Sequence, residues 1–433
     1  MRFDHTILLG ALLATPQVIN AANIPAVSIT NSTTSMYQLS TDSEFAFVLE
    51  TFLSLANGGG AATGEVLRSA ARIAPGNFES WYKEWKFMAD AIASQGDAVN
   101  ATKFPISAQQ AYFRAASYYR AADFFLHGNA SDPRILTLWA SMLKRYDAAA
   151  KLLPNPPEKV ELQGTGFKIP VYFYQAPQSS GVNQSQKIPT LIIGNGYDGA
   201  QQDLYHQFGQ QVLSRGWNFV TYEGPGQATV RREQNIGFIP QWWESVTPVI
   251  DWLRERDDVD IDRIALQGEH RIAALIALDG LLSLKNATLK KFPEPLVKLY
   301  ESGNKSKFDD AILSALNKKS TTTEFKWGVE QGTWAFNVAS PFDWIYKMGE
   351  MDLSPEMLKN ISCPVFVASG QDDSLAPGQP EKMARIFGNQ AHYHSFKTNV
   401  GAGEHCSIGA EPQLAMTELD WLANVFENVT KSP

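Results

Sequence analysis

The chain has 433 residues and a formal net charge of −8, with 44% hydrophobic and 19% charged residues. This length allows two or three domains around a large core. Acidic and basic residues are mixed without a basic stripe, so nucleic acid is not an expected partner, and two cysteines are too few for a disulfide framework.

Residues 1–22 have the pattern of a secretory signal peptide. Arg2 precedes a short apolar run, Thr6–Ala14, and the small residues Ala21 and Ala22 offer a cleavage site. This run is too short to span a bilayer, and no later apolar run is long enough to do so.

Asn-x-Ser/Thr sequons in loop-like stretches predict N-glycosylation of a secreted protein. The sequons begin at Asn31, Asn100, Asn129, Asn183, Asn286, Asn304, Asn360 and Asn428.

Residues 23–157 predict a helical domain. Apolar residues recur there at helical spacing, and Thr41 and Ser107 each open a sequence typical of a capping box. The aromatic residues between Tyr112 and Phe125 are expected to pack helices together rather than to form a binding face.

Strands and helices alternate after residue 157, which is typical of a mostly parallel sheet with helices on both faces. The first part of this α/β core spans residues 158–280. A polar, helix-rich insert over 281–358 predicts a cap, and the core pattern returns over 359–433.

Two apolar runs, Ile264–Gly268 and Ile272–Gly280, predict neighbouring buried strands of the parallel sheet. Parallel neighbours are normally connected by about a dozen residues or more, usually a helix. Only Glu269, His270 and Arg271 separate these runs. The sequence therefore predicts that one crossover helix is missing.

An aspartate and a histidine follow consecutive strands in the order typical of hydrolases that use a hydroxyl nucleophile. Asp373, with Asp372 as the alternative, is predicted to orient the imidazole of His405, which acts as the base. The loop after strand 189–194 is the expected source of oxyanion donors, with Gly196 and Tyr197 as candidates.

The sequence predicts neither a metal site nor a cofactor site. His392 and His394 share one face of a predicted strand, but no carboxylate or cysteine partner is evident, so a structural role is expected. The glycines of Glu223–Gly226 lack the spacing of a dinucleotide-binding motif. We expect a small-molecule substrate.

Seven motifs spread over most of the chain form a specific combination. They are Gly194–Asp198, Tyr222–Gln227, Ala277–Gly280, Trp334–Asn337, Ser340–Asp343, Gly378–Pro380 and Gly401–Cys406. The combination resembles the fungal α/β-hydrolases of secondary metabolism, including polyketide-shortening pigment hydrolases, and more distantly 2,6-dihydroxypseudooxynicotine hydrolase, which cleaves a C–C bond. The resemblance implies an α/β-hydrolase fold with a helical N-terminal domain, a helical cap and a Ser-Asp-His triad, to which Asp373 and His405 correspond.

The nucleophile elbow departs from the family pattern. Such chains carry Gly-x-Ser-x-Gly and a helix after this strand, whereas here Gly268 is followed directly by Glu269, and His270 stands where the serine is expected. Both flanks match the family, which favours a skipped exon or an error in exon prediction over gradual loss.

These observations predict a secreted serine hydrolase that acts on an ester, lactone, thioester or activated C–C bond, with its nucleophile absent from the chain as written. Two alternatives stay open: a catalytically inactive binding protein, and a mis-spliced form of an active hydrolase. The sequence leaves the substrate and the oligomeric state open, and a dimer is allowed.

Overall fold

The computed structural model describes residues 36–177, 187–267 and 272–431. The predicted signal peptide, the sequons at Asn31 and Asn183, and the expected elbow position at 268–271 lie outside the described residues. Residues from Thr34 onward form one compact unit. Among the described helices, none has the length and apolar character needed to cross a membrane.

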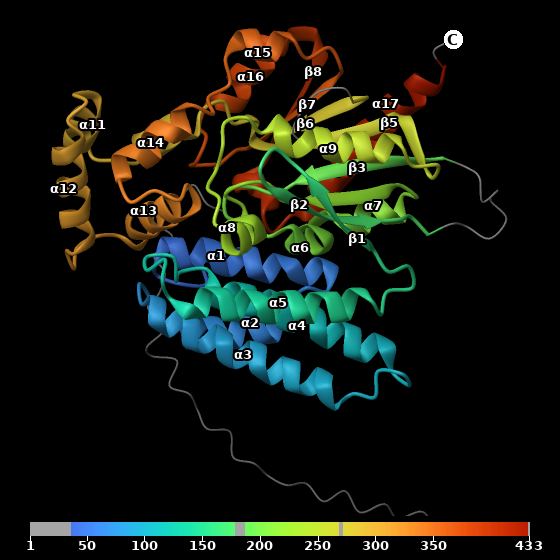
Figure 1. The fold of residues 1–433 in the computed structure, drawn as a ribbon, viewed down its shortest axis with the longest axis horizontal. Coiled ribbons are helices and arrows are strands. Elements are labelled where there is room, and N and C mark those ends of the chain that lie inside the picture. The colour runs from blue at the N-terminus through green and yellow to red at the C-terminus, as the bar shows by residue number, and fades with distance from the viewer. Residues whose placement is uncertain (1–35, 178–186, 268–271, 432–433) are drawn as a thin grey trace, which may run out of the picture. The chain divides into compact units, whose positions relative to one another are not determined.

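An eight-stranded sheet forms the centre of this unit, in the order β1-β2-β4-β3-β5-β6-β7-β8 (Figure 1). All neighbours from β4 to β8 pair in parallel, whereas β1 and β2 form an antiparallel edge. This confirms the predicted mostly parallel α/β sheet. The strands are β1 (Glu158–Gln163), β2 (Lys168–Tyr174), β3 (Ile188–Gly194), β4 (Asn218–Tyr222), β5 (Val259–Gln267), β6 (Ala274–Ala277), β7 (Val365–Gly370) and β8 (Ala391–Phe396).

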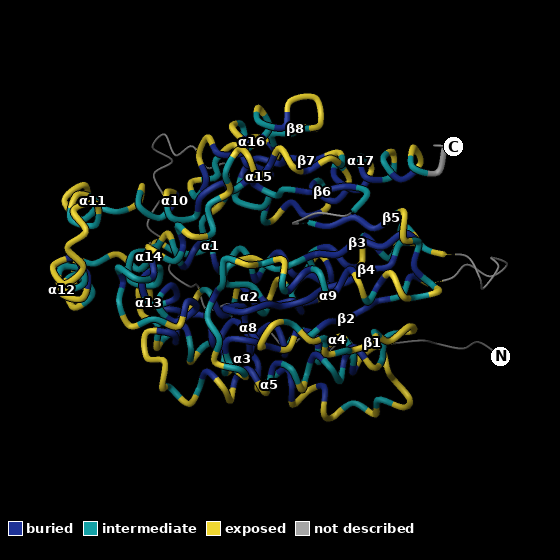
Figure 2. The backbone as a smooth tube through the Cα atoms, turned by 45° about the horizontal axis from the view of Figure 1, so that its top comes forward, coloured by how far each residue is buried: buried dark blue, intermediate teal, exposed yellow. Residues whose placement is uncertain are grey.

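The central strands are apolar on both faces because their side chains alternate between two cores. In β3, Leu191 and Ile193 join the core that includes the N-terminal helices, while Ile192 joins the core that contains residues of α9 (Trp243–Arg254). Figure 2 shows the central strands as largely buried segments. This two-sided burial explains the apolar runs without alternation in the sequence.

Five helices precede the sheet and lie together beside it (Figure 1). Trp81, Trp85 and Tyr118 are fully buried among them, and the rings of Trp85 and Tyr118 lie 5.4 Å apart. The aromatic residues therefore fill helix–helix interfaces, as expected. The helices are α1 (Ser43–Ser54), α2 (Thr63–Ala70), α3 (Phe78–Ala98), α4 (Pro105–Asp123) and α5 (Pro133–Ala150).

The helix starts predicted at Thr41 and Ser107 are wrong. Asp42 caps α1 by accepting a hydrogen bond from the backbone N–H of Phe45, because a carboxylate is a strong acceptor at this position. Helix α4 begins earlier, at Pro105, where the fixed φ of proline suits the first helical turn.

The remaining helices connect the strands or, in the case of α17, follow the last strand. Those in the core are α6 (Gln201–Leu204), α7 (Gln210–Ser214), α8 (Ala228–Gln234), α9, α16 (Gln379–Phe387) and the final α17 (Glu411–Lys431). Between β6 and β7, the cap contains α10 (Leu284–Lys290), α11 (Glu294–Glu301), α12 (Lys305–Leu316), α13 (Thr323–Ala335), α14 (Pro341–Gly349) and α15 (Pro355–Lys359). Helix α11 has no buried residue, and Figure 2 shows α11 and α12 as an exposed arm. Because helices and core form one compact unit, the domain boundaries at 157, 280 and 358 stay predictions.

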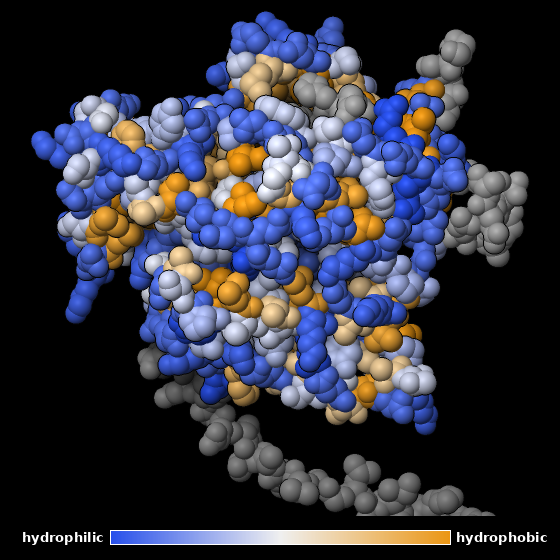
Figure 3. All heavy atoms as spheres, in the orientation of Figure 1, coloured by the Kyte–Doolittle hydropathy of each residue, from blue (hydrophilic) through white to orange (hydrophobic). Residues whose placement is uncertain are grey.

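The sequon asparagines of the described residues lie on the surface, where glycosylation is sterically possible, and glycosylation itself stays a prediction. On the face drawn in Figure 3, hydrophobic residues form scattered patches among hydrophilic ones. The exposed sequon residues are Asn100, Asn129, Asn286, Asn304, Asn360 and Asn428.

One buried carboxyl group in α17 has no hydrogen-bond partner among the described residues. Glu418 is 0% exposed, and α17 packs against β5, β6 and α7. Burial raises the pKa of Glu418 from 4.5 to about 8, because the apolar surroundings disfavour its charged form. The folded chain therefore holds a neutral Glu418 at neutral pH.

Glu418→Gln should change how stability depends on pH. The unfolded carboxyl ionises near pH 4.5 and the folded one near pH 8, so the folded state binds more protons in between and loses stability as the pH rises through this window. We expect the variant to match the parent's melting temperature at pH 5 and to melt several degrees higher at pH 8. Asp420→Asn, an exposed change on the same helix, is the control. An equal shift at both pH values would contradict the prediction.

Candidate functional site

The loops after β7 and β8 meet at the carboxyl edge of the sheet. The backbone N–H of Asp372 donates to the carbonyl of Gly403 at 2.8 Å. A Cβ atom at Gly370 would lie 2.4 Å from the carbonyl oxygen of Glu404, so only glycine permits this approach at the end of β7. These contacts bring the two loops close enough for their side chains to interact.

Asp373 and His405 form a direct pair. Oδ2 of Asp373 lies 3.1 Å from Nδ1 of His405, and Oδ1 accepts the backbone N–H of Leu375 at 2.7 Å. Asp372 instead accepts a hydrogen bond from the hydroxyl of Thr398 at 2.7 Å. Of the two candidate aspartates, Asp373 is therefore the one that contacts the ring, while its catalytic role stays a prediction.

A second carboxylate, Asp279, faces the same ring nitrogen. Its Oδ2 lies 3.0 Å from Nδ1 of His405 and also accepts the backbone N–H of Cys406, while Oδ1 accepts the N–H of Gly370 at 3.3 Å. The sequence pattern alone does not assign Asp279 to the site. The available signal was its position after β6, since the carboxyl ends of neighbouring parallel strands share one edge.

Three neighbouring side chains raise the pKa of His405 against the effect of burial. Burial by itself would lower the pKa of His405, but Cys406, Asp279 and Asp373 raise it well above its ordinary value. Burial raises the pKa of Asp373, and the hydrogen bond and charge of His405 more than offset this, so the net shift is downward. The resting site therefore holds an imidazolium, which must lose a proton before it can act as a base.

Cys406 places a thiol next to the ring without the features of an activated nucleophile. Its sulfur lies within 4.8 Å of ligand atoms of Asp279 and His405. Burial raises the pKa of Cys406 to about 11, so the thiol stays protonated at neutral pH. Its backbone N–H is engaged by Asp279 and does not serve as an oxyanion donor.

The predicted oxyanion loop follows β3. The N–H of Gly196 donates to Oδ1 of Asn195 at 2.8 Å, and the ring of Tyr197 stacks on Phe238 with centroids 5.8 Å apart. Burial raises the pKa of Asp198, and the charges of Arg120 and, more weakly, His405 oppose this rise. The loop therefore lies within electrostatic reach of His405. Oxyanion binding by Gly196 stays a prediction. It requires the N–H of Gly196 to leave Oδ1 of Asn195 and to donate to the substrate oxygen instead.

A small cavity of about 220 Å³ borders Asp373. Ser369, Glu381 and Ser395 also line it, between β7, β8 and α16. Drug-sized ligands usually occupy pockets of about 300–1,000 Å³, so in this conformation the cavity suits only a small polar molecule.

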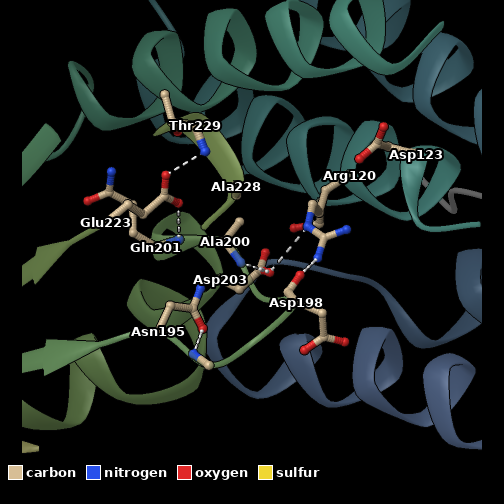
Figure 4. A network of polar contacts seen from close by, with 12 residues as sticks. Arg120, Asp123, Asn195, Asp198, Ala200, Gln201, Asp203, Glu223, Ala228 and Thr229 are labelled. Atoms are coloured by element: carbon tan, nitrogen blue, oxygen red, sulfur yellow. Dashed lines mark hydrogen bonds and ion pairs between the residues drawn. The ribbon is translucent and has the colours of Figure 1, made fainter. Parts of the chain in front are cut away.

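Buried polar contacts connect the N-terminal helices to the site loop (Figure 4). Arg120, from α4, donates to the backbone carbonyl of Asp198 and lies 3.9 Å from the carboxylate of Asp203. Glu223, after β4, accepts the backbone N–H groups of Gln201 at 2.9 Å and Thr229 at 2.7 Å. The helices thus contribute side chains directly to the region above the sheet.

A second buried group connects helices, core and cap. Arg232 of α8 pairs with Asp123 of α4, and the two side chains are 2% and 0% exposed. Arg232 also lies 4.2 Å from the ring centroid of Trp139 in α5 and 4.6 Å from that of Trp334 in α13. The ring of His127 stacks on Trp334 at 3.9 Å. The guanidinium of Arg232, in the core, therefore contacts two N-terminal helices, α4 and α5, and the cap helix α13.

The two strand histidines proposed for a structural role have packing contacts. The ring of His392 lies 5.4 Å from that of Phe366, and the ring of His394 lies 4.6 Å from that of Phe396. Among the described residues, the group that could hold a metal ion is instead Asp279, His405 and Cys406.

Arg232→Met should destabilise the fold strongly. It leaves the carboxylate of Asp123 buried without its guanidinium, which typically costs about 3–5 kcal/mol. The matched control is Lys298→Met, which breaks an exposed pair with Glu294 and should cost less than about 1 kcal/mol. Urea denaturation measures both, and equal losses would show that the buried pair contributes little.

Comparison with known proteins supplies relatives over most of the chain. The hydrolase LUC6 of a Fusarium species is 27% identical over 416 residues, which cover 90% of this chain and 98% of LUC6. The 20-hydroxy-prefusarin hydrolase FUS2 of Gibberella moniliformis is 28% identical and covers 85% and 93%. The alpha/beta hydrolase xenA of Xenoacremonium sinensis is 25% identical and covers 90% and 99%. No family model matches the chain.

Solved structures share the fold. The 2,6-dihydroxy-pseudo-oxynicotine hydrolase superposes with a TM-score of 0.65 at 19% identity and covers 87% of this chain and 95% of its own. AbyA5 superposes with a TM-score of 0.54 at 15% identity and covers 89% and 95%. These similarities show the α/β-hydrolase architecture with the helical N-terminal region.

Proposed function

Because the chain belongs to a family of fungal α/β-hydrolases, we propose that it derives from a serine hydrolase but lacks the nucleophile that its relatives use. The ancestral reaction is hydrolysis of an ester, lactone, thioester or activated C–C bond in a small molecule of secondary metabolism. His405 is the base of that ancestral triad, and Asp373 orients its ring. We also propose that the chain is secreted and glycosylated, which its N-terminal pattern and exposed sequons support.

The pairing of β5 with β6 is the observation that carries this proposal. Ala265 pairs with Ala274 and Leu266 with Leu275, in parallel, although only residues 268–273 connect the two strands. Every other parallel crossover in the sheet carries at least one helix. A crossover normally needs about a dozen residues or more, so the elbow and its helix are missing from between two strands that still occupy neighbouring positions.

The resting charge state supports the same proposal. In a working triad, the imidazole accepts a proton from the nucleophile during attack. Here Cys406, Asp279 and Asp373 raise the pKa of His405 well above its ordinary value, so the ring rests protonated beside the two carboxylates. These groups can bind charge but are poorly suited to activate a nucleophile.

A binding protein without turnover is the second candidate. The aromatic contacts of Tyr197 with Phe238 and Phe336 and the buried contacts of Arg120 persist without the elbow. This candidate predicts that an aromatic ligand raises the melting temperature but is recovered unchanged. A mis-spliced transcript of an active hydrolase is distinguished by sequencing the message across codons 266–272.

A fluorophosphonate probe tests the loss of the nucleophile. The chain as written should show no labelled serine in intact-protein and peptide mass spectrometry. A variant in which a Gly-x-Ser-x-Gly turn and a helix typical of this fold replace Gly268 should be labelled at the introduced serine, and the same variant with that serine changed to alanine is its control. A labelled serine in the uninserted chain would refute the proposal.

A further inference from the structure

Three kinds of ligand atom converge beside the ring of His405. A carboxylate oxygen of Asp279, a ring nitrogen of His405 and the sulfur of Cys406 all lie within 4.8 Å of one another. Oxygen, nitrogen and sulfur donors at this separation are the set that zinc binds in proteins. The three residues come from the end of β6 and from the loop between β8 and α17.

The separation of Asp279 and His405 is close to that of two ligands on one ion. Oδ2 of Asp279 lies 3.0 Å from Nδ1 of His405. Zinc–nitrogen and zinc–oxygen bonds of about 2.0–2.1 Å separate two ligands of a tetrahedral site by roughly 3.3 Å. Asp279 and His405 are therefore separated by nearly the distance that a shared ion requires.

The carboxylates beside the ring of His405 outnumber the protons that they can share there. Nδ1 of His405 carries one proton, whereas two carboxylate oxygens lie within hydrogen-bonding distance of it. A divalent cation bound by Asp279, His405 and Cys406 would supply additional positive charge there.

The backbone holds two of the donors in a costly conformation. Asp279 has φ of 54° and Cys406 has φ of 56°, both in the left-handed region that non-glycine residues rarely adopt. The N–H of Cys406 donates to the carboxylate of Asp279, and the N–H of Gly370 donates to its other oxygen. Such backbone contacts orient ligands as the outer partners of metal sites do.

We propose that Asp279, His405 and Cys406 bind one Zn²⁺ ion and leave its fourth position open to a small ligand. Binding releases the proton of Nδ1 and the proton of the Cys406 thiol to solvent, and no bond to carbon forms or breaks. Nitrogen and sulfur donors favour zinc over magnesium or calcium. The site does not rest on the proposed hydrolytic ancestry, because it requires only these three side chains.

Cobalt(II) is the probe, because a thiolate ligand gives it a charge-transfer absorption band that nitrogen and oxygen ligands do not. Purified full-length chain is stripped with a chelator and titrated with Co²⁺. We expect this band together with the visible bands of a tetrahedral ion, and loss of both when one equivalent of Zn²⁺ is added. Zn²⁺, but not Mg²⁺, should also raise the melting temperature.

Variants assign the ligands. Cys406→Ser should abolish the charge-transfer band, and Asp279→Asn should weaken Zn²⁺ binding by at least about tenfold. The matched controls are Cys363→Ser, which removes the other free thiol, and His392→Ala, which removes a histidine outside the group. Both controls should bind like the parent.

Three outcomes would overturn the proposal. They are the absence of the charge-transfer band in the parent chain, its persistence in Cys406→Ser, and its loss in Cys363→Ser. Because the first outcome is measured on the unsubstituted protein, misfolding of a variant cannot rescue the proposal. Fluorophosphonate labelling reports on the hydrolase proposal separately, so either proposal can fail alone.

Discussion

The rest of the sheet depends on the pairing of β5 with β6. This pair is the junction between the strands from β1 to β5 and those from β6 to β8 in the sheet order. The ladder is short, and the N–H of Ala273 adds a hydrogen bond to the carbonyl of Ile264 at 2.8 Å. The strands are held beside each other mainly by burial, since Ala265, Leu266 and Ala274 are 0% exposed. Packing of both faces thus preserves a strand order that the connecting segment is too short to explain by itself.

That junction also decides the chemistry of the site. In this fold the nucleophile belongs at the turn after β5, and its partners lie after β7 and β8. With the sheet order retained, Asp373 and His405 still meet. Among the described residues, Asp279, Asp373 and the thiol of Cys406 lie beside the ring of His405. The result is a charged cluster rather than a poised base.

The helices around the sheet are held by a combination of apolar and ionic contacts. Aromatic side chains such as Trp81 and Trp85 fill the interior of the helical layer. At its contact with the core and cap, Arg232, Asp123 and His127 replace apolar packing with buried charge and hydrogen bonds. Burial lowers the pKa of His127, with Arg232 adding to the effect against Asp123, so the ring is neutral beside the ion pair. These contacts fix where the helices lie over the strand ends.

The sequence by itself determined the sheet class, the helical N-terminal region and the positions of Asp373 and His405, because periodicity and chain order depend on local patterns. It also located the short connection at Gly268, since strand-to-strand spacing can be counted. Only the tertiary structure showed that Asp279 faces His405 and that Asp373 rather than Asp372 contacts the ring. Side-chain direction at the end of a strand depends on φ values and on neighbouring loops, and neither is encoded in residue spacing. The placement of the sulfur of Cys406 beside Asp279 and His405 has the same origin, because Cys406 adopts a left-handed backbone conformation that residues other than glycine rarely adopt.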